Sequence, residues 1–212
     1  MEKFCTTYNV SRETFNKLKT YQSMLNDWQQ RFNLVSKTTL EDAWNRHFLD
    51  SAQLFSYIPN NAKTMYDFGS GAGFPGMVIA VLASEKLPNL RINLVESITK
   101  KTVYLNAVKE KLGLDVTIYN DRIEKLPIEK ADIITSRALA SLSELLEYSY
   151  RFCHKDTVCL FPKGKKYSEE LADAHKKWHF KCEIIPSQQC DEGRILKITN
   201  INKKGGNKCL GY

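Results

Sequence analysis

Between residues 63 and 161 the chain alternates short apolar runs with segments of helical length. The apolar runs are four to six residues long and lie at 63–68, 90–95, 116–119, 131–135 and 157–161. Segments that can form crossover helices lie between them, at 76–87, 100–112 and 139–152. Strands separated by helices of this length are typical of repeated βαβ units. We therefore predict an α/β fold with a Rossmann-like, mostly parallel sheet that helices cover on both faces.

The pattern changes after residue 161. A helix is predicted at 168–178, and strand-like runs follow at 181–186 and 194–201. The loop between these two runs contains Gly193 and is too short to hold a crossover helix, so the two strands should be antiparallel to each other. The sheet is therefore expected to be mostly parallel with an antiparallel C-terminal strand.

The first 58 residues have a helical period instead. Large apolar side chains recur every three or four positions from Phe15 to Phe32, and Ser11 is the predicted N-cap of that helix. A second helix fits residues 40–57 and ends before Pro59, because the residue preceding a proline avoids the helical conformation. The expected organisation is a helical extension at 1–58, a sheet domain at 59–202 and a basic tail at 203–212.

A chain of 212 residues is long enough to bury one full hydrophobic core. The longest unbroken apolar run, residues 77–83, is far shorter than the roughly 18 residues that span a membrane, and the first ten residues lack the apolar core of a signal peptide. The six cysteines form no C-x-x-C pair, and no Cys and His residues have the spacing of zinc ligands. We expect a monomeric cytoplasmic protein with free thiols, no metal site and no membrane contact.

Residues 67–76, DFGSGAGFPG, follow a predicted strand and begin a predicted helix. Glycines at 69, 71 and 73 let the backbone turn sharply and let a ligand approach main-chain N–H groups, and Pro75 suits the first position of a helix. The segment is therefore expected to bind a nucleotide-like ligand. The spacing Gly71-x-Gly73-x-x-Gly76 also satisfies the dinucleotide fingerprint, and a glycine turn without a ligand is a further alternative.

Asp67 bears on the choice between two ligands. A dinucleotide presents a pyrophosphate, which a carboxylate would repel, whereas S-adenosylmethionine has no phosphate and carries an ammonium and a sulfonium group. Asp67 therefore favours S-adenosylmethionine if it contacts the ligand. A strand-end Asp that accepts hydrogen bonds from loop N–H groups is the alternative, and the sequence does not distinguish the two.

Two further positions are predicted to hold the nucleoside. Glu96 ends the second strand, 23 positions after Gly73, where a βαβ unit places a carboxylate on the two ribose hydroxyls. A surface Glu is the alternative. The loop at 120–124 follows the third strand and should lie over the base, where a main-chain N–H group and an apolar flank can hold adenine.

Basic residues follow the fourth and fifth strands. Arg137 could pair with a substrate phosphate, with a cofactor carboxylate, or with Glu144 or another nearby acid in a salt bridge. Lys163, Lys165 and Lys166 come to the same edge and could bind a phosphodiester backbone or form a solvated charged surface. The net charge is +7, and +5 of it lies in the last 52 residues. This concentration favours a polyanionic partner, although a basic excess also serves solubility.

Several motifs of the chain resemble those of the bacterial small-subunit ribosomal RNA guanine-N7 methyltransferases, also called the glucose-inhibited division protein B family. They are DFGSGAGFPG, DRIEKLP at 121–127, TSRALASL at 135–142, Lys163-Gly164, FNLVS at 32–36 and RHFLDS at 46–51. The resemblance spans nearly the whole chain. It is most specific at residues 73–76 and 136–138, which methyltransferases in general do not share.

The resemblance implies a class I methyltransferase sheet with an N-terminal helical extension, and methyl transfer from S-adenosylmethionine to one guanine of small-subunit rRNA. It implies cofactor contacts at Gly69, Phe74, Ile123, Glu124 and Arg137, to which the motif reasoning above adds Gly71 and Glu96. The family often has Asp in place of Glu96 and Leu in place of Phe74, and both changes keep the chemical character. The rRNA, free or in an assembling subunit, is expected to contact Arg46, Lys163, Lys165 and Lys166.

Guanine N7 carries an in-plane lone pair and no proton, so it can attack a sulfonium methyl group directly. Alignment and exclusion of water are then the main requirements, and we nominate no catalytic acid or base. His47 is expected to be structural or to contact RNA. Three other functions compete: a nicotinamide-dependent oxidoreductase, a non-catalytic RNA-binding assembly factor, and a methyltransferase acting on another RNA, a protein or a small molecule.

Overall fold

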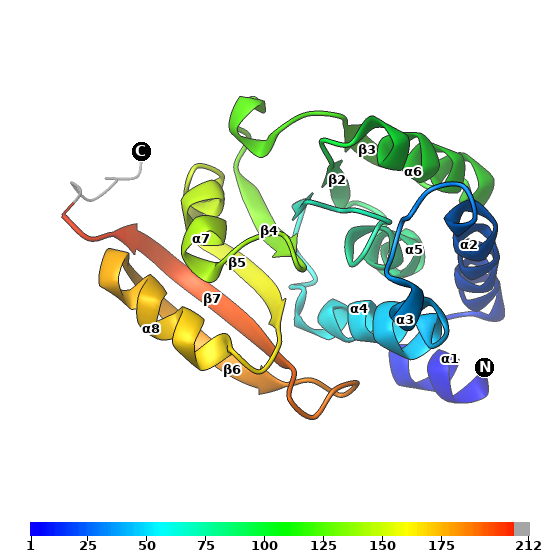
Figure 1. The fold of residues 1–212 in the computed structure, drawn as a ribbon, viewed down its shortest axis with the longest axis horizontal. Helices are drawn as coiled ribbons and strands as arrows, with labels where there is room; N and C mark the ends of the chain where they lie inside the picture. Colours follow the sequence, from blue (N-terminus) through cyan, green and yellow to red (C-terminus); the bar gives the residue numbers. More distant parts are fainter. Residues whose placement is uncertain (206–212) are drawn as a thin grey trace.

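A computed structural model describes residues 1–205, which form one seven-stranded sheet with the order β3-β2-β1-β4-β5-β7-β6 (Figure 1). Five of its strands are parallel: β1 (Thr64–Phe68), β2 (Arg91–Val95), β3 (Val116–Tyr119), β4 (Ala131–Ser136) and β5 (Cys153–Lys163). The strand order reverses at β1, which pairs with β2 on one side and β4 on the other. Open α/β sheets bind ligands at the carboxyl ends of the strands beside such a reversal.

The C-terminal strands confirm the predicted antiparallel addition. β7 (Arg194–Lys203) lies between β5 and β6 (Trp178–Pro186) and is antiparallel to both. Lys203, placed in the tail by the sequence pattern, is the last residue of β7. Of the predicted tail, residues 206–212 lie outside the described part of the chain.

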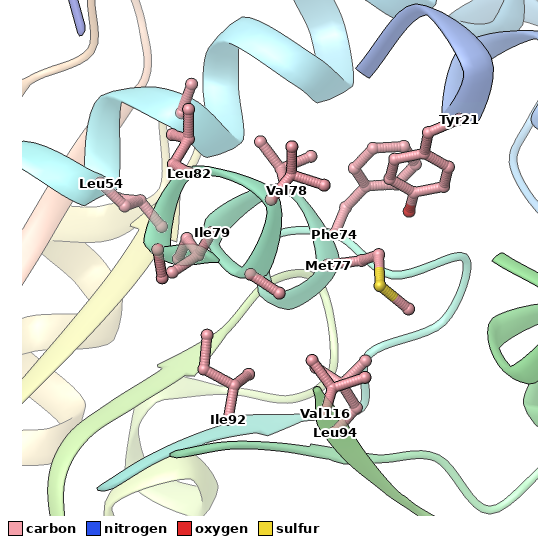
Figure 2. Packing of buried hydrophobic residues seen from close by; sticks show 14 of the residues in the cluster. Tyr21, Leu54, Phe74, Met77, Val78, Ile79, Leu82, Ile92, Leu94 and Val116 are labelled. Carbon is pink, nitrogen blue, oxygen red and sulfur yellow. The ribbon is translucent and has the colours of Figure 1, made fainter. Parts of the chain in front are cut away.

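Helices cover both faces of the sheet. α5 (Gly76–Lys86) and α6 (Thr99–Leu112) pack on one face, and α7 (Leu142–Tyr150) and α8 (Tyr167–Lys177) pack on the other. Residues 76–83 of α5 are all buried, because the helix lies between the sheet and the N-terminal extension. Figure 2 shows this layer, with Val78 and Ile79 of α5 above Ile92 and Leu94 of β2.

The N-terminal extension begins with α1 (Glu2–Tyr8) and α2 (Arg12–Gln29). The predicted cap is present, because the Ser11 hydroxyl accepts a hydrogen bond from the Thr14 N–H group. α2 contacts α5 and α6, and extension residues such as Leu25 and Leu54 belong to the same buried cluster as α5. Figure 1 shows α2 beside α6, on the opposite side of the molecule from α8. The extension therefore shares the core of the sheet domain.

The single helix predicted at 40–57 is wrong. Four short pieces cover this region: α3 (Lys37–Leu40), the π-helical η1 (Trp44–Leu49), α4 (Asp50–Ala52) and the 3₁₀-helical η2 (Gln53–Tyr57). Arg137 donates a hydrogen bond to the carbonyl of Arg46 within η1. This contact lies within the π-helical segment, where the backbone departs from the α-helical hydrogen-bond pattern. In the described residues, no helix is long and apolar enough to cross a membrane.

Candidate functional site

A cavity of about 830 Å³ opens at the carboxyl ends of β1 and β4. Its wall combines the turn after β1, the loop at 137–140 after β4, residues 162–164 at the end of β5, the loop between β6 and β7, and the extension, which contributes residues between 34 and 50. Gln53 joins the extension to the loop between β6 and β7, since its side chain accepts from the Gln188 N–H group and donates to Ser187 Oγ. The extension therefore forms part of the cavity wall.

The turn after β1 has the backbone that its glycines predict. Gly69, Gly71 and Gly73 have φ values of 68°, 59° and 95°, a left-handed region that residues with a side chain rarely adopt. The N–H groups of Gly69 and Ser70 both donate to the Val95 carbonyl, which fixes the turn against the end of β2. α5 begins at Gly76, so Pro75 occupies the N-cap position and not the predicted first helical position.

The glycines of this turn have two different roles. A Cβ at Gly71 would have open space, because its one neighbour within 4 Å is the Gly69 carbonyl oxygen at 3.8 Å. A Cβ at Gly73 would collide with the Tyr21 hydroxyl and with Met77, and one at Gly76 would collide with Leu94 and Asp67. Gly73 and Gly76 are therefore required by packing, and Gly71 keeps space open beside the turn.

Glu96 supports this turn. Its side chain is buried, and its two carboxylate oxygens accept hydrogen bonds from the N–H groups of Gly71 at 2.9 Å and Ile98 at 2.8 Å. An ionised carboxylate offers about four acceptor sites. Among the described residues two of these sites are left for other donors, so Glu96 can hold the turn and still accept a pair of hydroxyl groups, although Glu96 itself does not line the cavity.

Asp67 contacts protein groups and does not line the cavity. Its carboxylate accepts from the Gly76 N–H group at 3.1 Å and from the Thr135 hydroxyl at 2.8 Å. Burial raises the pKa of Asp67 to about 6, against the opposing effect of these hydrogen bonds. The alternative of a strand-end Asp that binds loop N–H groups is therefore the observed arrangement. The charge argument against a pyrophosphate loses its force, since this carboxylate does not face the cavity.

Arg137 lies on the cavity wall and contacts the extension. Its Nη1 donates to the Arg46 carbonyl at 2.9 Å and pairs with Asp50 Oδ2 at 3.3 Å, and its Nη2 lies 2.8 Å from His47 Nδ1. The nearby acid is therefore Asp50. Glu144, the partner named in the sequence-based alternative, instead completes a capping box with Ser141 at the start of α7.

The ring of Phe74 is covered by protein and is only 4% exposed. It stacks against His47 at 4.9 Å and against Tyr21 at 5.4 Å between ring centroids. Figure 2 shows Phe74 and Tyr21 side by side, and the Tyr21 hydroxyl also donates to the Ala72 carbonyl. Tyr21 was not singled out from the sequence, because its position in the α2 apolar stripe marks it as a core residue. Little of the Phe74 ring is left for a ligand.

The three predicted lysines occupy different environments. Lys163 lines the cavity, but its ammonium group pairs with Glu170 at 2.7 Å and donates to the Ala140 carbonyl at 2.9 Å. Lys165 and Lys166 are exposed just before α8. Lys163 is therefore held by protein groups, whereas the side chains of Lys165 and Lys166 have no ion-pair or hydrogen-bond partner among residues 1–205.

Other predicted residues lie on and beyond the rim. Arg46 is exposed and lines the cavity. Ile123 is buried and Glu124 is exposed, both on η3 (Ile123–Lys125), and neither lines the cavity. Two cations that sequence reasoning missed, Lys101 and Arg194, also line it. The position of Lys101 just after the Glu96 loop was a usable signal, whereas nothing in the sequence pattern marked Arg194.

Comparisons with known proteins agree with this geometry. The family model described as GidB, rRNA small subunit methyltransferase G, matches residues 14–194. Ribosomal RNA small subunit methyltransferase G of Rhodospirillum centenum is 39% identical over 202 residues, covering 95% of this chain and 91% of that protein. The protein of the same name in Parvibaculum lavamentivorans is 40% identical over 207 residues, covering 97% of this chain and 91% of the relative.

Solved structures support the fold. A SAM-dependent methyltransferase from Aquifex aeolicus superposes with a TM-score of 0.58 at 16% identity, covering 77% of this chain and 96% of that one. A TehB-like SAM-dependent methyltransferase from Corynebacterium glutamicum gives a TM-score of 0.57 at 14% identity, covering 86% and 98%. The fold is that of the class I methyltransferases. With the matches at 39% and 40% identity, the chain belongs to the GidB family of rRNA small subunit methyltransferases G.

Proposed function

We propose that this protein transfers the methyl group of S-adenosylmethionine to N7 of one guanine in small-subunit ribosomal RNA. The observation that carries the proposal is the family match over residues 14–194, which covers most of the extension and most of the sheet domain. The position of the cavity supports it, because the cavity lies where class I sheets bind their ligands.

The residues at the cavity fit S-adenosylmethionine. The open space at Gly71 admits a ligand to the turn. Glu96 does not line the cavity itself, but it is hydrogen-bonded to Gly71, which does, and its remaining acceptor sites suit the two ribose hydroxyls. The guanidinium of Arg137 suits the carboxylate of the methionine moiety. Gly69 and the backbone at Phe74 would complete this wall, and Ile123 and Glu124 would lie at the adenine, beyond the wall.

The chemistry needs alignment more than proton transfer. When bound, S-adenosylmethionine supplies an electrophilic methyl group on a sulfonium. Guanine N7 has a lone pair and no proton, so the protein needs no general base. The glycine-rich turn and Arg137 would hold the two ends of the cofactor, and the extension would exclude water from one side of the cavity.

The rRNA would bind at the cationic rim. Arg46, Lys101, Lys163 and Arg194 line the cavity, and Lys165 and Lys166 are exposed next to Gly164, which also lines it. Contacts of such side chains with phosphates supply affinity and make it depend on salt. We propose that the protein acts as a cytoplasmic monomer on rRNA or on an assembling small subunit.

The test is methyl transfer from labelled S-adenosylmethionine to free rRNA and to partly assembled small subunits, followed by mapping of the modified base. The expected result is one labelled guanine, modified at N7, with an Arg137→Ala variant as the weakened control. Label in another RNA, in a protein or in a small molecule would change the substrate assignment. Cofactor-independent binding to rRNA without transfer would instead favour a non-catalytic assembly factor, and binding of NAD in place of S-adenosylmethionine would favour an oxidoreductase.

A further inference from the structure

The guanidinium of Arg137 is held from the extension side of the cavity. A guanidinium carries five N–H groups and accepts no hydrogen bond. Three of them are engaged, by the Arg46 carbonyl, by Asp50 Oδ2 and by His47 Nδ1. In the part of the chain that the structure describes, two N–H groups of Arg137 remain without a hydrogen-bond partner, which is the number that a bidentate carboxylate requires.

This contact defines the protonation state of His47. Because Arg137 can only donate, Nδ1 must be the acceptor, and the proton of the neutral ring is then on Nε2. Burial lowers the pKa of His47 to about 3, with further lowering by the charges of Arg137 and Arg46. The imidazole is therefore neutral at physiological pH and acts as a fixed acceptor for the guanidinium.

Packing alone does not explain an imidazole at this position. His47 is 6% exposed, and its Nε2 is buried without a hydrogen-bond partner among residues 1–205. A buried donor without a partner destabilises the folded state. The stack on Phe74, at 4.9 Å and 21°, needs only an aromatic ring, which a phenylalanine would supply without that buried N–H group. The imidazole must therefore contribute something that a carbocyclic ring does not.

We propose that His47 is a positioning residue for Arg137: it fixes the plane of the guanidinium so that the two remaining N–H groups face the carboxylate of the bound cofactor. Asp50 and the Arg46 carbonyl both bind Nη1, and the guanidinium carbon lies over the Phe74 ring, 5.3 Å from its centre, so these contacts leave the group free to turn about Nη1 above that ring. The bond from Nη2 to His47 adds the second point that defines the plane. This inference rests on the proposed function, in which Arg137 binds the methionine carboxylate.

The experiment compares two ligands by calorimetry on the full chain. S-adenosylhomocysteine carries the carboxylate, and 5′-methylthioadenosine lacks the amino-acid group. His47→Phe keeps the ring and loses the acceptor, whereas His47→Asn loses the ring and keeps an acceptor near the position of Nδ1. His175→Phe is the matched control, because His175 also stacks on a phenylalanine, Phe180, but does not line the cavity.

We expect His47→Phe to lower the affinity for S-adenosylhomocysteine about threefold to tenfold and to leave the affinity for 5′-methylthioadenosine unchanged. The variant protein should unfold at a temperature no lower than that of the wild type. His47→Asn should retain most of the wild-type preference for the carboxylate, and His47→Phe should have no further effect in an Arg137→Ala background. Equal weakening of both ligands, equal loss in the Phe and Asn variants, or a much lower unfolding temperature for His47→Phe would make His47 a packing residue and overturn the inference.

The Arg137→Ala variant distinguishes an error in the proposed function from an error in the role of His47. If it leaves the preference for S-adenosylhomocysteine unchanged, the cofactor role of Arg137 in the proposed function is wrong, and the inference about His47 is wrong with it. If Arg137→Ala removes the preference and His47→Phe does not reduce it, only the inference about His47 is wrong.

Discussion

The cavity wall has two halves that are held in different ways. The turn half, between β1 and α5, is fixed by main-chain N–H groups: those of Gly69 and Gly71 bind Val95 and Glu96 at the end of the neighbouring β2. The cationic half, after β4 and β5, is held by side-chain ion pairs. There Arg137 pairs with Asp50, which is 87 residues earlier in the chain.

This difference predicts how each half responds to change. A backbone turn with positive φ angles has one shape and offers no rotamers, so it is preorganised for a ligand. An ion pair between flexible side chains can exchange partners, and its strength depends on burial and salt. Substitutions in the turn half should therefore abolish cofactor binding or leave it almost intact, whereas substitutions in the cationic half should reduce the affinity by intermediate amounts.

The largest effect is expected from Gly71→Val. The branched side chain would enter the open space beside the turn, and we expect cofactor affinity to fall by about a hundredfold or more by calorimetry. The positive φ also adds strain of about 1–3 kcal/mol. Gly113→Val is the matched control, because Gly113 has a φ of 61°, nothing within 4 Å of its Cβ position and no place on the cavity wall.

Both variants should lose similar stability, and only Gly71→Val should lose cofactor binding. Wild-type cofactor affinity in a folded Gly71→Val protein would mean that the ligand does not approach this turn. The turn half would then not be part of the cofactor site.

Replacement of Arg137 should produce a graded effect. A charge-assisted hydrogen bond contributes roughly 1.5–3 kcal/mol. Arg137→Ala should therefore lower the affinity for S-adenosylhomocysteine about tenfold to a hundredfold, and by less where water reaches the carboxylate. Arg137→Lys should lie between wild type and Ala, because one ammonium group cannot form two parallel hydrogen bonds. Titration calorimetry of the three proteins measures this order. An abrupt loss in the Lys variant, equal to that of Ala, would contradict the graded behaviour of the cationic half.

Asp67 lies where the two halves meet, since it binds Gly76 on one side and Thr135 on the other. Its pKa is raised from 3.8 to about 6, so the folded state binds this proton more tightly than the unfolded state. The contribution of Asp67 to stability is therefore greatest below pH 4 and falls as the pH rises through 6.

Asp67→Asn should remove this part of the pH dependence. Urea unfolding of both proteins between pH 4 and 7.5 gives the difference in the free energy of unfolding, which should change by on the order of 2 kcal/mol across that range in favour of the variant at higher pH. A difference that stays constant with pH would mean that Asp67 titrates alike in the folded and unfolded states.

The sequence predicted the turn half well for a physical reason. Its residues come from one βαβ unit, so strand, glycine spacing and helix start appear together in 67–76, and Glu96 follows at the next strand end. The parallel sheet and its antiparallel addition followed equally from local periodicity and loop length. The single helix predicted at 40–57 did not, because the π-helical η1 in this region contacts Arg137, which follows β4, and such a distant contact leaves no mark in local periodicity.

The cationic half could be located from the sequence but not resolved. The ends of β4 and β5 placed Arg137 and Lys163 at the ligand edge, where both now lie. Their partners Asp50 and Glu170 come from elements whose relative position depends on tertiary packing, which leaves no mark in local spacing. For Asp67 the sequence predicted the position at the end of the strand. It did not predict that the side chain points to Gly76 and away from the cavity.

The smallest effect is expected where the cationic half meets RNA, and it divides the three lysines. Lys165 and Lys166 are exposed, so replacing both with Gln should weaken rRNA binding about threefold to tenfold and reduce the slope of log affinity against log salt by about two, while cofactor affinity stays constant.

Lys163→Gln should instead leave Glu170 without its ion-pair partner at the edge of the cavity, and should lower the unfolding temperature more than the double variant does. Filter binding of rRNA at several salt concentrations, together with thermal unfolding, measures both effects. If the double variant keeps the wild-type salt slope, Lys165 and Lys166 form only a solvated surface. If Lys163→Gln changes the salt slope without any loss of stability, the ion pair with Glu170 gives way to RNA, and Lys163 belongs with the other two as a phosphate contact.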